Sequence, residues 1–100
     1  MPLGDSDIAF AVDLFSDLGP VTTRKMFGGM CLYHDGTVFA LMSSQGRLYL
    51  KTRDPVALYG DQTDQFHTMP YHAVPEDVLD DPARACSIAR EALDRLREEP

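Results

Sequence analysis

Residues 21 to 53 constrain the fold most, because turn signals divide them at regular intervals and the apolar residues between the turns follow a period of two. Asp35-Gly36 is a dipeptide that accepts positive φ in a tight hairpin turn. Paired glycines at Gly28-Gly29 indicate a bulge or a close backbone approach, and Ser43 to Gly46 make a further turn. The pattern predicts an antiparallel β-meander of four short strands, over residues 22–26, 30–33, 38–42 and 47–52.

Helical patterns flank this meander. Apolar residues recur every three or four positions over residues 5–18 and again from Pro82 onward. Gly19-Pro20 ends the first helix, and Asp54-Pro55 opens a short middle helix. An irregular strand, or a strand pair interrupted by Pro70, is expected over residues 66–74, and a helical turn over residues 75–79. The order predicts an α+β fold, with the N- and C-terminal helices packed on one face of the sheet.

The length of 100 residues predicts a single domain over residues 1–100. Two cysteines are too few for a disulfide-stapled secreted scaffold, and no stretch approaches the roughly 20 apolar residues that cross a bilayer. We therefore expect a cytoplasmic, reduced protein with no membrane partner. The net charge of −7 disfavours a surface that grips duplex DNA.

The charge is unevenly distributed along the chain. Between residues 22 and 53, five basic residues against Asp35 alone give +4, so the rest of the chain carries −11. One interpretation is that these Lys and Arg side chains simply solvate the sheet and protect its edges. The other is that they form a face that docks an acidic protein partner, with Arg24-Lys25 next to the apolar Met26-Phe27.

Catalytic and metal-binding patterns do not stand out. His67 and His72 are five residues apart, which on a strand places them on opposite faces and suits no shared metal. His34 is expected to be an idle turn residue. Cys31 has no neighbouring base and is expected to pack as a small buried hydrophobe. We predict no enzyme, no metal and no cofactor.

Three linked motifs nevertheless resemble a known family. They are Thr23 to Met30, with its Arg-Lys-Met-Phe-Gly-Gly run, then Tyr33 to Leu41 around Asp35-Gly36, and Gly46 to Lys51 with its Leu-Tyr-Leu-Lys strand. Met69-Pro70-Tyr71 and Val74-Pro75-Glu76 follow in order. This pattern is similar to the N-terminal domain of the TfoX/Sxy family.

The resemblance implies an α+β sheet flanked by helices, similar to small secretion-chaperone-like folds. It also implies a non-enzymatic regulatory or adaptor module in competence and transcription regulation, with a protein partner for which a transcription activator is one candidate. Family members usually have more residues between the position of Phe66 and the Met-Pro-Tyr segment, so a shortened hairpin is expected here.

Two sets of residues follow. The partner-binding residues are expected to be Arg24, Lys25, Phe27, Arg47, Tyr49 and Lys51. The residues expected to maintain the motif structure are Met26, Gly28, Gly29, Asp35, Gly36, Phe39, Leu48, Leu50, Pro70, Tyr71 and Pro75.

Alternative functions remain open at this point. The basic sheet face could bind single-stranded nucleic acid, with Tyr33 or Tyr49 as a stacking platform. A small-molecule or enzymatic role could use Cys31. Self-association into a homodimer through a free sheet edge is also consistent with the sequence.

Overall fold

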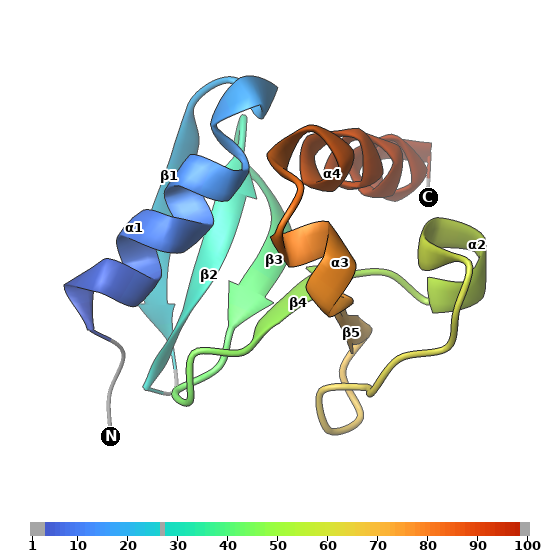
Figure 1. Ribbon diagram of the computed structural model, residues 1–100, viewed down its shortest axis with the longest axis horizontal. Helices are drawn as coiled ribbons and strands as arrows, with labels where there is room; N and C mark the ends of the chain where they lie inside the picture. Colours follow the sequence, from blue (N-terminus) through green and yellow to red (C-terminus); the bar gives the residue numbers. More distant parts are fainter. Residues whose placement is uncertain (1–3, 27, 99–100) are drawn as a thin grey trace.

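The computed structural model describes residues 4–26 and 28–98, and its centre is a five-stranded antiparallel sheet (Figure 1). The strands pair in chain order, β1-β2-β3-β4-β5. They are β1 (Val21–Met26), β2 (Gly29–His34), β3 (Thr37–Met42), β4 (Leu48–Lys51) and β5 (Tyr71–Ala73). The predicted meander is therefore confirmed, and the irregular strand expected over residues 66–74 is reduced to the short β5.

The helices lie where the apolar periodicity and the caps predict them. They are α1 (Asp5–Leu14), α2 (Pro55–Tyr59), α3 (Glu76–Leu79) and α4 (Pro82–Glu98). The predicted helix over residues 5–18 is interrupted at Phe15 and continues as the short 3-10 helix η1 (Ser16–Leu18). Figure 1 shows α1, α3 and α4 in front of the same face of the sheet, which confirms the α+β class.

Local chemistry accounts for the ends of the middle helix. The Asp54 carboxylate accepts a hydrogen bond from the Ala57 N–H at 3.0 Å, and Pro55 occupies the first turn. Gly60 ends α2 in the left-handed conformation, with φ 87°. This short element positions Tyr59, whose hydroxyl donates to the His72 carbonyl at 3.0 Å and so ties α2 to β5.

The main core lies between the sheet and the helices. Phe15 packs edge-on against Phe39, with ring centroids 5.2 Å apart, and both rings are fully buried. A β-bulge makes this contact possible, because Leu32 pairs with Ala40 while Tyr33 pairs with Val38, leaving Phe39 as the extra residue. Both Phe39 and Ala40 therefore belong to the helix-covered core.

The glycine pair after β1 is required by a close backbone approach, as predicted. A Cβ atom added to Gly29 would collide with the carbonyl oxygen of Met42 on the neighbouring β3 strand. Gly28 has φ 77°, which favours glycine for a second reason.

Among the described residues, no helix is long and apolar enough to cross a membrane.

Candidate functional site

The sheet has a second apolar face on the side opposite α1, α3 and α4, which we call the outer face. Directly paired residues of antiparallel strands project to the same side of a sheet. A cross-strand row on this side runs from β1 to β5 through Arg24, Cys31, Leu41, Tyr49 and Ala73. The last four form a small buried cluster with Tyr71, separate from the main core.

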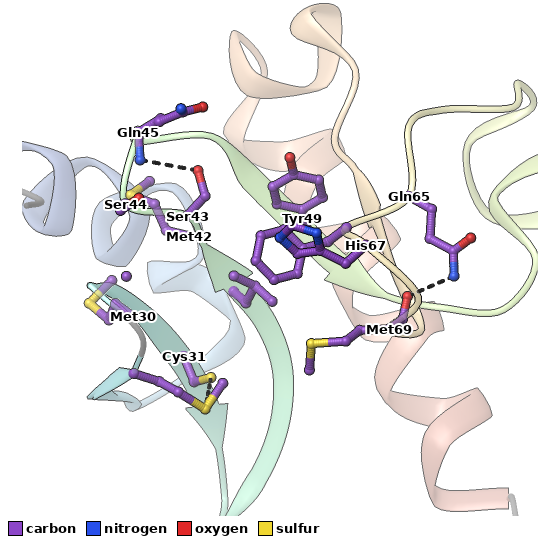
Figure 2. Close-up of a pocket in the computed structure, with 14 residues that line it drawn as sticks. Met30, Cys31, Met42, Ser43, Ser44, Gln45, Tyr49, Gln65, His67 and Met69 are labelled. Atoms are coloured by element: carbon purple, nitrogen blue, oxygen red, sulfur yellow. Dashed lines mark hydrogen bonds between the residues drawn. The ribbon is translucent and has the colours of Figure 1, made fainter. Parts of the chain in front are cut away.

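A pocket of about 560 Å³ opens on the outer face (Figure 2). One wall comes from the end of β1 and the start of β2, the second from the turn after β3, and the third from the segment that precedes β5. In Figure 2 the Met69 side chain extends from this third wall towards the side of the pocket formed by β2, the strand that carries Cys31. The residues used in the argument below are Met26, Gly29, Cys31, Tyr49, Phe66 and Met69.

Two sulfur atoms meet in this pocket. The Cys31 thiol donates to the Met26 sulfur at a distance of 3.9 Å, and Cys31 is 3% exposed. Burial raises the pKa of the Cys31 thiol, and the positive charge of Lys51 lowers it only in part. The thiol is therefore protonated near neutral pH and packs as the sequence predicted, because thiolate is the reactive form.

The segment over residues 65–69 folds back over the outer face. The Phe66 ring packs edge-on against Tyr49, with ring centroids 5.1 Å apart. The backbone N–H of Phe66 donates to the Tyr71 carbonyl at 2.8 Å. The Gln65 amide donates to the Met69 carbonyl at 3.0 Å and closes the loop. As a result Tyr49 is only 7% exposed and does not offer an open stacking platform.

The outer face is electrostatically mixed at its β4 end. The Arg47 guanidinium forms an ion pair with Asp64 at 3.1 Å and lies 5.6 Å from the centroid of the Tyr49 ring. The hydrogen bond to Asp64 raises the pKa of Arg47. Arg47 is therefore already engaged within the protein.

Tyr71 also lies on the outer face. Burial raises the pKa of Tyr71 to about 12, with smaller effects from Cys31 and Tyr33.

The structure separates the six residues that the sequence grouped as partner-binding. Arg24 lies on the outer face and is exposed, and Lys51 lies on the same face because it pairs with Tyr71. Lys25 lies on the opposite side of β1, since it pairs with the core residue Met30. Arg47 is ion-paired, Tyr49 is buried, and Phe27 lies outside the described residues.

The residues predicted to maintain the motif occupy structural positions. Asp35 and Gly36 form the β2–β3 turn with φ 50° and 79°. Phe39, Leu48 and Leu50 lie in the main core, and Met26 and Tyr71 lie on the outer face. Gly28 precedes β2 and Gly29 is its first residue. The Pro70 carbonyl accepts from the Thr52 N–H, and Pro75 precedes α3.

The histidines are placed by structural contacts. His34 is not an idle turn residue, because its Nε2 donates to the Leu18 carbonyl at 2.9 Å and its Nδ1 accepts from Arg97 at 3.2 Å. His72 is buried and its Nδ1 bonds the Thr52 carbonyl at 2.9 Å. His67 lies in the loop against Phe66. Within residues 4–26 and 28–98, no three His, Cys, Asp or Glu side chains gather as a metal site.

Sequence reasoning missed the contribution of the loop before β5. Phe66 and Met69 lie in a stretch without periodicity, so no pattern indicated that they would cover the outer face. The opposite orientations of Arg24 and Lys25 did have a signal, because consecutive strand residues project to opposite faces.

Comparison with known proteins agrees with this architecture. The chain matches the TfoX N-terminal domain over residues 13–96, a range that includes the whole sheet and most of α4. A search of curated proteins gave no match. The match covers far more than half of the 100 residues, and the chain therefore belongs to the TfoX N-terminal domain family.

Proposed function

We propose that this domain is a non-enzymatic regulatory module that uses its outer face to bind an acidic segment of a protein partner. The observation that carries the proposal is a pocket containing methionine and aromatic side chains on the face opposite the helices, which shares this face with Arg24 and Lys51. Methionine side chains adapt to different apolar partners and are common on protein-binding surfaces.

Two of the cations on the outer face, Arg24 and Lys51, supply the preference for acidic partners. Arg24 is exposed and Lys51 is half-buried, and in the described part of the chain neither belongs to an ion pair. The rest of the protein is strongly acidic, so this face differs in sign from its surroundings. Such a contrast orients an incoming acidic segment towards the pocket.

Regulation of transcription is the proposed setting, and family membership supports it. The proposed partner is a protein of the transcription machinery, and the proposed location is the cytoplasm. Catalysis is not part of the proposal, because the buried Cys31 thiol has a raised pKa and contacts sulfur rather than a base.

A capture experiment tests the proposal. The wild-type domain is immobilised and compared with the variant Arg24→Glu plus Lys51→Glu. The matched control is Arg53→Glu plus Arg84→Glu, which makes the same charge change at exposed arginines away from the pocket. Circular dichroism confirms that each variant is folded.

We expect at least one protein of a native lysate to be retained by the wild type and the control and lost from the outer-face variant. Its retention should also fall in about 1 M salt, where the Debye length is roughly 3 Å. Identical captured proteins for both variants would contradict a role for the outer face.

A further inference from the structure

The two edges of the sheet differ in how much of their backbone is free. At β5 the edge is occupied, because the Ala73 N–H donates to the Asp64 carbonyl at 2.8 Å and Gln65 forms a β-bridge with His72. At β1 the four residues from Thr22 to Lys25 are all exposed, and among the described strands β1 pairs only with β2. Unpaired strand edges are templates for a further strand.

The exposed edge carries adjacent positive charges on both of its sides. Arg24 projects to the outer face and Lys25 to the helix-covered face, because their partners in β2 are Cys31 and Met30. In the described part of the chain, neither side chain takes part in an ion pair. A strand added at this edge would therefore lie beside Arg24 on the outer face of the sheet and beside Lys25 on the helix-covered face.

We propose that β1 accepts an extended acidic segment of a partner protein as a sixth strand. This inference rests on the proposed function, since it specifies how the acidic partner binds. Backbone hydrogen bonds to the free edge would supply affinity, and side chains on the two faces would supply selectivity.

The register of β1 defines which sequence would fit. Residues directly opposite Arg24 and Lys25 would be acidic, and the residue opposite Met26 would be apolar. Because Met26 lines the pocket and shares the outer face with Arg24, that apolar side chain would lie at the pocket rim. The expected pattern is two consecutive acidic residues beside one large apolar residue, in an order set by the direction of the strand.

A second copy of this chain fits the edge less well. Suppose that two β1 strands pair antiparallel about their centres and that the outer faces of the two sheets lie on the same side. Arg24 of one copy then lies directly opposite or diagonally across from Arg24 of the other copy. Such an arrangement brings together basic residues that have no carboxylate between them. Charge therefore favours a different, acidic partner over self-association.

Synthetic peptides with fluorescent labels test the proposal on the intact domain. The probes are Thr-Val-Leu-Glu-Glu-Val-Thr and, for the opposite strand direction, Thr-Val-Glu-Glu-Leu-Val-Thr. Each is compared with a version in which Lys-Lys replaces Glu-Glu. We expect one acidic peptide to bind, and Arg24→Glu and Lys25→Glu each to weaken it about threefold or more. The control Arg53→Glu should change binding by less than about twofold.

Two further arms make the result specific. The domain carrying both Arg24→Glu and Lys25→Glu should bind the Lys-Lys peptide, which also shows that the variant is folded. Methylation of alternate peptide amides should abolish binding in one of the two possible sets and spare it in the other, since alternate amides of a strand face the domain.

Several outcomes would overturn the strand addition. Equal tolerance of both methylated sets would show that the backbone is not paired. Loss on Arg24→Glu without loss on Lys25→Glu would leave docking on the outer face intact and reject the sixth strand. Absence of peptide binding would reject it as well, while the capture experiment would still decide the proposed function separately.

Discussion

The sulfur atoms of Cys31 and Met26 lie 3.9 Å apart, and this contact joins the edge strand β1 to its neighbour β2 across the outer face. Both residues also line the pocket. Cys31 thus lines the pocket without being available as a nucleophile, because it is 3% exposed and its pKa is raised by burial.

The thiols should react slowly in the folded protein. Cys31 and Cys86 are both buried, and the Cys86 thiol donates to the Leu14 carbonyl at 3.3 Å. We expect a disulfide reagent at pH 8 to modify both at least about tenfold more slowly than in urea. In Cys31→Ala, where Cys86 is the remaining thiol, Cys86 should also be modified at least about tenfold more slowly in the folded protein than in urea. Rapid modification of one thiol in the native wild type, lost in Cys31→Ala, would contradict the packing role.

The protein should lose stability in alkaline solution. Burial raises the pKa of Tyr71 from 10.0 to about 12, so the unfolded chain releases this proton at lower pH than the folded one. The free energy of unfolding should be unaffected by Tyr71 below pH 10 and should fall between pH 10 and 12. Urea unfolding at several pH values measures this slope, and Tyr71→Phe should make it shallower.

Tyr59 provides a comparison for the alkaline series. Its burial also raises its pKa, and the hydrogen bond from its hydroxyl to the His72 carbonyl would be lost in Tyr59→Phe. This variant should therefore be less stable at neutral pH by about 1 kcal/mol, whereas Tyr71→Phe should be close to the wild type there. Identical alkaline slopes for the wild type and both variants would contradict the assignment.

Gly29→Ala should destabilise the sheet strongly. The added Cβ would meet the Met42 carbonyl oxygen, a backbone atom that cannot rotate away. We expect a loss of about 2 to 3 kcal/mol in the free energy of unfolding. Gly36→Ala is the matched control, because its Cβ has no atom within 4 Å but φ is 79°, so it should cost only about 1 kcal/mol. Equal losses for the two variants would count against the close approach.

Phe66→Ala should release the loop that covers the outer face. The variant loses the edge-on contact with Tyr49, at 5.1 Å between centroids, and about 2 kcal/mol of stability. Hydrogen exchange should accelerate at position 66, whose N–H bonds the Tyr71 carbonyl, and at Met69, whose N–H bonds the carbonyl of position 66. It should not accelerate at Leu32 in the sheet centre. A uniform acceleration across the sheet would instead indicate global destabilisation.

Much of the fold follows from local sequence chemistry. Asp35-Gly36 adopts the positive φ angles that its turn requires, and Asp54 with Pro55 opens α2. The bulge at Phe39 was beyond sequence reasoning, because it depends on how β3 is registered against β2. The apolar period also predicted a helix that continues through Phe15. In the structure the helix ends at Leu14, and Phe15 packs against Phe39, a tertiary contact that the period does not reveal.

The candidate site was less predictable than the fold. The basic residues were visible in the sequence, but their separation depends on strand orientation and on long-range pairs such as Arg47 with Asp64. The third wall of the pocket depends on residues 65–69 returning over Tyr49, a tertiary contact without a periodic signal. Charge composition alone therefore grouped side chains that the structure places on different faces.

The occupied β5 edge limits what this sheet can build. Within the described residues, only the β1 edge is open, so the sheet can pair directly with one further strand. A second copy of this chain that paired through β1 would use the open edge of both copies at once. Copies of this chain alone could therefore form a closed pair by strand addition but could not propagate it into a fibre.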